Sequence, residues 1–378
     1  MNAIILAGGK SSRMFQTGGD IHKALLPIQN IPNIERTILM LHCCNITEII
    51  IAVPYGNTLF DYLGEKYSCK IAYGYQDCAN TLYTLKPLMK YLGDTFIIEG
   101  DVVLAKNIFE LFDCSTYYVM KYPYPEKDAW YPILNSDGII SSFQIGGADQ
   151  PAIFGISFWA HKDCPFLISH LEEKMSLYSI DNPNIFWDDN IFEILNKVPI
   201  KTFEIASNTA CEMNTYTEYK FAQDLCKNII YNNFFFDNVL LYTKRKLSYK
   251  IISSTNKSKN AYWVKQLLLF YGEKIEENLP YEEFFSPKEI VYIIRNEQNQ
   301  EIAFFSLVQQ KHYILLRRIY IIPKFRRQQI GKLIVQYVYL FSKLNLKELR
   351  INVYDKNAEK FYQYLGFKEL FKTFCLEH

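Results

Sequence analysis

The chain has 378 residues, which is enough for two domains of ordinary size. Its 41 lysines and arginines nearly balance its 40 aspartates and glutamates, so the net charge of +1 argues against a nucleic-acid-binding protein. Hydrophobic residues make up 49% of the chain, yet no run of about 18 apolar residues predicts a membrane span.

Cysteine usage and the first residues bear on the cellular compartment. The nine cysteines are scattered and form no C-x-x-C pair, so we expect neither structural zinc nor a disulfide framework. No basic segment precedes an apolar one at the start of the sequence, so we expect no secretory signal. These features together predict a cytoplasmic protein.

The first candidate site lies at the start of the chain. The apolar run Ala3–Ala7 predicts a buried parallel strand. Glycines and basic residues follow it in close succession, namely Gly8, Gly9, Lys10, Arg13 and Lys23. Glycines after a strand let backbone N–H groups approach an anion, and Arg and Lys side chains can add charge to the same phosphate chain. The order predicts a triphosphate-binding loop that differs from the GxxxxGK[ST] and GxGxxG loops.

This stretch resembles a known family. L-A-G-G-x-x-x-R-M followed by K-A-L-L-P is similar to the signature loop of the sugar-nucleotidyltransferase-like family, and within it most to that of the bacterial phosphocholine cytidylyltransferases. Members join a nucleoside triphosphate to a phosphorylated partner and release pyrophosphate. The resemblance implies nucleotide contacts from Leu6, Ala7, Gly8 and Gly9. It also implies that Lys10, Arg13 and Lys23 offset charge in the transition state.

Residues 1–225 alternate short apolar strands with helical patterns, which predicts an α/β domain with a mixed, mostly parallel sheet; the resemblance makes it Rossmann-like. The expected strands are Ala3–Ala7, Glu48–Val53, Lys70–Gly74, Thr95–Glu99, Thr116–Lys121, Ala152–Phe158 and Lys201–Ile205. The expected helices are Ile34–His42, Leu59–Tyr67 and Thr81–Tyr91.

A candidate base-reading segment follows the strand Lys70–Gly74. In the wider family a Gln and a Gly-Thr at this spacing read the base, and here Gln76 precedes Asn80 and Thr81. N-T-L-Y-T-L resembles the cytidylyltransferase variant N-N-x-Y-S-L, which implies cytosine. The residues alone predict equally well that Asn80 caps a helix.

Two acids are candidate ligands of Mg²⁺, which prefers hard oxygen donors. Asp101 ends an apolar strand, where open α/β sheets bind ligands, although it could instead cap the next element. The resemblance favours the metal role for Asp101. The segment W-D-D-N resembles the W-D-N segment of the phosphocholine enzymes and implies a second ligand, Asp188 or Asp189, of which we prefer Asp188. The other aspartate would then cap a helix at Asn190–Lys197.

The phosphorylated partner is predicted from aromatic residues. Asp128 and Trp130 lie where the phosphocholine enzymes have an acid-x-Trp element, and Trp187 precedes the second acid. A tryptophan face attracts a quaternary ammonium group, so these residues are expected to bind a phosphocholine-like substrate. In so aromatic a chain they could equally be core residues. Phosphoethanolamine or an aminophosphonate would also suit such a pocket.

The rest of the chain predicts a second, α+β domain. The segment 221–246 has no clean period, so we expect domains at 1–230 and 245–378, with the junction between them. The expected strands are Tyr249–Ser253, Ile290–Arg295, Glu301–Gln309, Tyr313–Ile322 and Glu348–Val353. The expected helices are Lys257–Tyr271, Gly331–Leu344 and Asn357–Leu365.

This second domain resembles the GNAT acetyltransferases through R-x-x-G-x-G/A at Arg326–Gly331, with Gln329 in place of the first glycine, and through the closing helix N-x-x-A-x-x-F-Y-x-x-x-G-F. The resemblance implies acetyl-CoA binding by Ile321, Arg326, Arg327, Gln328, Gln329, Ile330, Gly331, Lys332 and Asn357. It implies that Tyr362 protonates the leaving thiolate. No general base is evident: Arg317 and Arg318 stand where some relatives have an acid, which leaves Glu289, Glu301 or an amine that arrives deprotonated.

The sequence thus predicts a bifunctional enzyme. The first domain would use Mg²⁺ to transfer CMP from CTP to a small phosphorylated compound, and the second would use acetyl-CoA to acetylate an unknown amine. One alternative is a sugar-1-phosphate or other nucleotidyltransferase that uses UTP or GTP. Another is that the second domain is a non-catalytic module for binding or oligomerisation.

Overall fold

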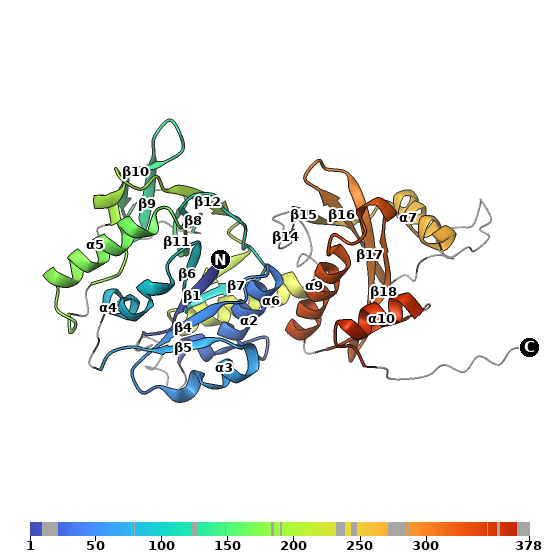
Figure 1. Cartoon of the computed structure of the whole chain (residues 1–378), viewed down its shortest axis with the longest axis horizontal. Coiled ribbons are helices and arrows are strands. Elements are labelled where there is room, and N and C mark those ends of the chain that lie inside the picture. The colour runs from blue at the N-terminus through green and yellow to red at the C-terminus, as the bar shows by residue number, and fades with distance from the viewer. Residues whose placement is uncertain are drawn as a thin grey trace, which may run out of the picture. The chain divides into compact units, whose positions relative to one another are not determined.

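The computed structural model describes residues 1–9, 22–76, 78, 80–122, 128–147, 149–182, 185–189, 191–231, 239–242, 248–270, 285, 288–345, 347–353 and 356–368. The chain divides into two compact units, Met1–Lys246 and Leu247–His378 (Figure 1).

The first unit is built on a mixed, mostly parallel sheet, as predicted. Among the described residues it has seven strands in the order β12-β8-β11-β6-β1-β4-β5. Their bounds are β1 (Asn2–Leu6), β4 (Ile49–Val53), β5 (Lys70–Tyr73), β6 (Thr95–Glu99), β8 (Thr116–Met120), β11 (Ala152–Trp159) and β12 (Lys201–Ile205). β11 runs antiparallel to β6 and β8, and the other neighbours pair in parallel. β1 and β4 are buried throughout because helices cover both faces.

Helices flank this sheet. They are α2 (Asn33–Cys43), α3 (Tyr62–Tyr67), α4 (Thr81–Leu85), α5 (Cys164–Leu177) and α6 (Tyr216–Tyr231). α4 and α5 lie on one side, and the apolar core between them and the sheet includes Ile4, Ile50 and Ile97 (Figure 1). The predicted helix Thr81–Tyr91 changes at Lys86 into a 3-10 helix, η3 (Lys86–Tyr91), because Pro87 cannot donate the helical hydrogen bond.

In the described part of the chain, three short strand pairs outside this sheet were not predicted. They are β2 (Pro27–Ile28) with β3 (Ile31–Pro32), β7 (Val102–Leu104) with β13 (Ala210–Glu212), and β9 (Trp130–Leu134) with β10 (Ile140–Ile145). The expected helix Asn190–Lys197 is replaced by the 3-10 turn η4 (Ile191–Ile194), and further 3-10 turns are η1 (Lys23–Leu25) and η2 (Thr58–Phe60). Strand β14 (Val239–Tyr242) follows α6 in the chain and is not part of this seven-stranded sheet.

The second unit is a strand meander with helices on both faces, as its predicted α+β class requires. Its strands are β15 (Ser248–Ser254), β16 (Glu289–Asn296), β17 (Glu301–Gln309), β18 (Tyr313–Ile321) and β19 (Glu348–Ile351). They pair in this order, antiparallel except for β18 with β19. α7 (Lys257–Phe270) and α9 (Ile330–Leu344) lie on opposite sides of the sheet, and α10 (Lys356–Tyr364) follows (Figure 1).

The core under α7 is aromatic. The Trp263 ring lies 5.8 Å from that of Phe304 and 6.2 Å from that of Tyr320. In the described part of either unit, no helix has both the length and the hydropathy needed to cross a membrane.

Candidate active sites

The ends of β1 and β6 bring the glycine turn and the predicted metal acid together. Leu6 pairs with Glu99, and Gly100 then donates its N–H to the Leu6 carbonyl at 2.9 Å. A Cβ at Gly100 would lie 2.7 Å from that carbonyl oxygen, so only glycine permits this approach. Asp101 and Gly8 therefore both lie at the carboxyl ends of the parallel strands, where open α/β sheets bind their ligands.

The β7–β13 pair adds two residues that the sequence analysis missed. Glu212 pairs with Val102, so Asn214 reaches the level of Gly100 and comes close to Asp101. The Lys23 ammonium joins them, since its Nζ lies 2.5 Å from Asp101 Oδ2 and 3.0 Å from Asn214 Oδ1. The structure therefore brings Lys23, Asp101, Glu212 and Asn214 together from three segments of the chain.

The signal for Asn214 was present in the sequence. Thr215-x-x-Glu218 is a capping box at the start of α6. The Glu218 carboxylate accepts the N–H groups of Asn214 and Thr215, and the Thr215 hydroxyl accepts that of Glu218. This cap fixes the backbone of Asn214. An acid and an amide two positions apart, directly before a capping box, would have been the pattern to look for.

Carboxylates outnumber the described cations at this site. Burial raises the pKa of Glu99 to about 8, with further increases from the charges of Asp101 and Asp188. Burial and then the charge of Asp101 raise the pKa of Glu212 to about 7. Burial likewise raises the pKa of Asp188 to about 6. Such shifts mean that burial and neighbouring charges disfavour the ionised form of these carboxyl groups, which a bound cation would stabilise.

The donor set fits Mg²⁺ bound together with a nucleotide. Within the described residues no three His, Cys, Asp or Glu side chains could hold an ion among themselves. Mg²⁺ is commonly held by one or two carboxylates while phosphates and water complete its shell. Asp101 and its neighbours supply oxygens of that kind. The charge of Asp188 raises the pKa of Glu99. Asp101, in contrast, contacts Lys23, which also donates to Asn214.

His22 lies at the base of the glycine turn. Its Nε2 is 2.8 Å from the Gly9 carbonyl, and its Nδ1 accepts the N–H of Ala24 at 3.2 Å. These two bonds define the neutral tautomer with the proton on Nε2. Burial lowers the pKa of His22, which is 5% exposed. Lys10 and Arg13, two of the predicted cations, lie outside the described residues.

Asn80 is a helix cap, which was the alternative interpretation of this residue. Its Oδ1 accepts the N–H of Tyr83, and its Nδ2 donates to the carbonyls of Ser179, Ile180 and Asn182. The side chain is 5% exposed and is held in this cap. Thr81 accepts the N–H of Trp187 through its hydroxyl, and Gln76 is exposed.

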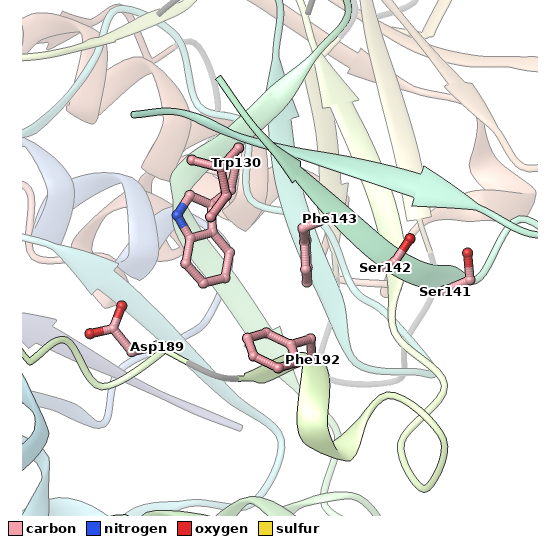
Figure 2. A pocket seen from close by; sticks show the side chains of 7 residues that line it. Trp130, Ser141, Ser142, Phe143, Asp189 and Phe192 are labelled. Atoms are coloured by element: carbon pink, nitrogen blue, oxygen red, sulfur yellow. The ribbon is translucent and has the colours of Figure 1, made fainter. Parts of the chain in front are cut away.

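An aromatic pocket lies beside Asp189. It has a volume of about 560 Å³ and is lined by Trp130, Ser141, Ser142, Phe143, Ile145, Asp189 and Phe192. Figure 2 shows the rings of Trp130, Phe143 and Phe192 around a common space, with the Asp189 carboxylate next to it. The Trp130 and Phe143 rings are 5.4 Å apart. The sequence contained no signal for Phe143 or Phe192, because the β9–β10 pair that places Phe143 was not predicted.

The other predicted substrate residues are placed differently. Trp187 is 4% exposed and packs on Trp159 in the core, and its indole N–H donates to Glu99 at 3.3 Å. Trp187 therefore holds the Glu99 carboxylate through this hydrogen bond and does not line the pocket. Asp128 is exposed and does not line the pocket either. Asp189 accepts the N–H of Phe186 instead of capping a helix.

In the second unit, the predicted CoA-binding segment begins α9. Gln329 precedes the helix in the left-handed region, with φ of 68°, and Arg327 has φ of 62°. The GNAT motif has a glycine where this chain has Gln329. The left-handed conformation explains that preference, because glycine adopts it without cost. A Cβ at Gly331 would meet the Phe361 ring at 3.3 Å, so glycine allows α10 to pack on α9.

The remaining predicted residues surround this helix start. Ile321 ends β18, and its carbonyl accepts the Arg326 Nε–H at 2.9 Å. The Gln328 amide oxygen accepts the Tyr249 hydroxyl at 3.0 Å. Ile330 is buried, whereas Lys332 is partly exposed. The side chain of Asn357 lies outside the described residues.

Tyr362 and the two candidate bases occupy constrained positions. Tyr362 is 5% exposed, between the rings of Phe361 and Phe367. The Glu289 side chain is fully buried and ion-paired with two arginines. Burial acts to raise the pKa of Glu301, but hydrogen bonds from Lys259 and Arg295 lower it overall. Neither glutamate is suited to accept a proton from an amine.

Known proteins resemble both units. The model of the MobA-like NTP transferase domain matches residues 3–112, and that of the acetyltransferase (GNAT) domain matches residues 287–369. A choline-phosphate cytidylyltransferase of Haemophilus influenzae is 36% identical over 221 residues, 58% of this chain and 94% of the relative. A 2-aminoethylphosphonate cytidylyltransferase of Lancefieldella rimae is 25% identical over 224 residues, 57% of this chain and 89% of the relative. The solved CTP:phosphocholine cytidylyltransferase LicC of Streptococcus pneumoniae superposes with a TM-score of 0.54 at 25% identity, covering 59% of this chain and 98% of that one.

Proposed function

Because the chain belongs to the choline-phosphate cytidylyltransferase family and carries a GNAT acetyltransferase domain behind it, we propose that it is a bifunctional cytoplasmic enzyme. The first unit transfers CMP from CTP to a small phosphate or phosphonate that bears a cationic head group, in a Mg²⁺-dependent reaction. The second unit transfers an acetyl group from acetyl-CoA to an amine.

The observation that carries the first activity is the aromatic pocket with Asp189 in its lining. Trp187, whose indole donates to Glu99, and Asp189 are two residues apart, so their Cα atoms lie within about 7 Å of each other. An aromatic face attracts a quaternary ammonium by about 0.5–2 kcal/mol. The Asp189 carboxylate adds the opposite charge. Two of the relatives are named for phosphocholine and 2-aminoethylphosphonate. Both compounds have a cationic group at one end and phosphorus oxygens at the other.

The chain's own groups supply positioning and charge. The backbone N–H groups at Gly8 and Gly9 face the triphosphate, and Lys23 moves from Asp101 to a phosphate oxygen. A phosphate oxygen of the substrate forms a bond to the α-phosphorus, and the bond to the bridging oxygen breaks to release pyrophosphate. That nucleophile is already ionised, so no general base is needed. Lys10 and Arg13 would add charge from the loop.

Asp101 and the Asn214 amide oxygen would hold Mg²⁺, with Asp188 as the alternative second ligand. When bound, the ion neutralises charge that develops on the phosphate oxygens. Since the Asn80 amide is engaged in its cap, we assign cytosine recognition to Gln76 and to backbone groups near Thr81.

In the second unit, the backbone N–H groups from Gln328 to Lys332 would bind the CoA pyrophosphate at the start of α9. The amine nitrogen bonds to the acetyl carbon, the carbon–sulfur bond breaks, and Tyr362 donates a proton to the thiolate.

Pyrophosphate release tests the first activity. The full-length protein would be assayed with Mg²⁺, each of CTP, UTP, GTP and ATP, and phosphocholine, phosphoethanolamine, 2-aminoethylphosphonate or glucose 1-phosphate. We expect turnover with CTP and the cationic head groups. Preference for UTP or GTP with glucose 1-phosphate would contradict the proposal. Calorimetry with acetyl-CoA tests the second activity, and absence of binding would make that unit a non-catalytic module.

A further inference from the structure

A β-bulge in the second unit places two arginines against one carboxylate. Along β17 and β18, Leu307 pairs with Leu316 and Ser306 with Arg318, so Arg317 has no opposite residue. Neighbours on a regular strand point to opposite faces, but a bulge interrupts that alternation. Arg317 and Arg318 consequently both contact Glu289.

The Glu289 carboxylate holds these arginines in place. Its side chain is fully buried, Arg317 Nη1 lies 2.7 Å from its Oε2, and Arg318 Nη1 donates to its Oε1. The Ser306 hydroxyl donates to the same Oε1 at 2.6 Å. Two guanidinium groups share one carboxylate, so this cluster carries one positive charge in excess.

The two arginines differ in what they can still bind. The Arg318 side chain is 15% exposed, and its guanidinium lies 5.0 Å from the centre of the Phe285 ring. The Arg317 side chain is 33% exposed, and its described hydrogen bond to Glu289 uses Nη1. A guanidinium has five N–H donors in a planar fork that matches an oxyanion. Arg317 can therefore present the rest of its fork to a ligand while Arg318 anchors the pair.

Arg317 also directly follows the last residue of β18 that pairs with β19. The parallel pairing of β18 with β19 ends at Leu316 and Ile351, whereas β18 continues to Ile321. From Arg317 to Ile321 the strand spans about 13 Å, and it then leads to the start of α9. A CoA molecule with its pyrophosphate on α9 can lay its extended arm along this edge, which brings the thioester toward Arg317.

We propose that Arg317 binds an anionic group of the acetyl acceptor, so that the acceptor is a small amine that also carries a carboxylate, phosphate or phosphonate. This inference rests on the proposed acetyl transfer. A nearby guanidinium disfavours the ammonium form of the acceptor. Its proton therefore passes to solvent, and the amine nitrogen attacks without Glu289, whose carboxylate is occupied by both arginines.

Matched amines test the proposal. The full-length protein would be given acetyl-CoA with ethanolamine, phosphoethanolamine, 2-aminoethylphosphonate, glycinamide, glycine or spermidine, and CoA release would be measured. We expect the anionic member of each pair to be turned over with the lower KM, and spermidine to be a poor acceptor. Glycine against the two phosphorus compounds separates a carboxylate site from a phosphate or phosphonate site.

Two variants complete the experiment. Arg317→Gln should raise KM for the anionic acceptor about tenfold or more, with kcat and the KM for acetyl-CoA little changed. Arg295→Gln is the matched control, since Arg295 lies on the same sheet, is 30% exposed and is ion-paired with Glu301; it should change none of these values.

The outcomes separate two failures. If acetyl-CoA does not bind in calorimetry, the proposed acetyl transfer fails, and this inference fails with it. If acetyl-CoA binds, then preference for ethanolamine or spermidine, no turnover of any anionic amine, or an unchanged KM in Arg317→Gln overturns the acceptor assignment alone.

Discussion

At the scale of single residues, the first unit concentrates carboxylates around one lysine. Asp101 contacts Lys23, and its charge contributes to the raised pKa values of Glu99 and Glu212. Such an arrangement opposes folding, since each buried carboxylate prefers water. It is expected where a cation and a charged substrate later supply the compensation.

The second ligand of Mg²⁺ can be identified by comparing two variants. We expect Asn214→Ala to raise the Mg²⁺ concentration for half-maximal pyrophosphate release about tenfold or more, because the amide oxygen beside Asp101 is lost. Asp188→Asn should have a smaller effect, and Asp101→Ala should abolish release while the fold is retained. If Asp188→Asn raises the Mg²⁺ requirement and Asn214→Ala does not, Asp188 is the second ligand.

His22 should make the stability of the protein depend on pH and should support nucleotide binding through the Gly9 carbonyl. Its imidazole is buried and faces the Gly9 carbonyl, Lys23 and Asp101, and its pKa is lower in the folded protein than in the unfolded chain. As pH falls below about 6.5, the unfolded chain binds the proton first. The stability that the neutral ring contributes is therefore complete above that pH and lost below it.

Urea unfolding at about pH 7.5 and about pH 5.5 measures this effect. His22→Leu should lose less stability on acidification than the unaltered protein, and its KM for CTP should rise because leucine cannot donate to the Gly9 carbonyl. His42→Leu is the control: burial also lowers the pKa of His42, so the pH response should weaken while the KM for CTP stays unchanged. An unchanged KM in His22→Leu would show that the bond from His22 to Gly9 does not contribute to nucleotide binding.

At the scale of elements, the ends of β1 and β6 meet more closely than side chains allow. We expect Gly100→Ala to destabilise the first unit by about 2 kcal/mol or more, because its Cβ would lie 2.7 Å from the backbone oxygen of Leu6. Gly64→Ala, within α3, meets its nearest backbone atom at 3.4 Å and should be nearly neutral. Equal thermal midpoints for both variants would contradict this account.

The start of α9 carries a conformational cost that glycine would remove. We expect Gln329→Gly to stabilise the second unit by about 1 kcal/mol, because φ at this position is 68°. Acetyl-CoA affinity should be retained, since backbone N–H groups would make the contacts. Gln328→Gly, which only removes the bond from Tyr249, should not stabilise. Loss of acetyl-CoA binding in Gln329→Gly would show that the glutamine side chain takes part.

At the scale of the whole molecule, the two units have separate cores. Trp159 and Trp187 belong to the first, and Trp263 with Phe304 belongs to the second. The relatives of the first unit also occur as chains of about its length, since this chain covers 94% and 98% of two of them. These facts support the proposed division into residues 1–230 and 245–378.

Residues 1–246 alone should therefore fold and transfer CMP. We expect the fragment to release pyrophosphate with the same kcat and KM for CTP as the full chain. Calorimetric unfolding of the full chain should show two transitions. Acetyl-CoA should raise the midpoint temperature of one, and CTP with Mg²⁺ that of the other. A fragment that is folded by circular dichroism but inactive would show that the second unit contributes to the first active site.

The sequence by itself determined the strands of the two main sheets and the two fold classes. Strands such as β1 and β6 are buried on both faces and therefore consist of continuous apolar runs. Such runs can be recognised in the sequence without knowing which strands pair with them. The start of α9 was likewise predicted from a local motif. Failures occurred where a local rule was broken, as at Pro87, or where a helix has only a weak apolar period, as with α5.

Only the tertiary structure decided which residues meet. Asn214 reaches Asp101 because β13 pairs with β7 in one register, and Phe143 reaches Trp130 because β9 pairs with β10. Asn80 and Trp187 matched sequence motifs, yet their partners are the carbonyls near Ser179 and the Glu99 carboxylate. Arg317 and Arg318 share Glu289 through a bulge. Strand register and bulges depend on pairing between distant segments, and that information is absent from any local pattern.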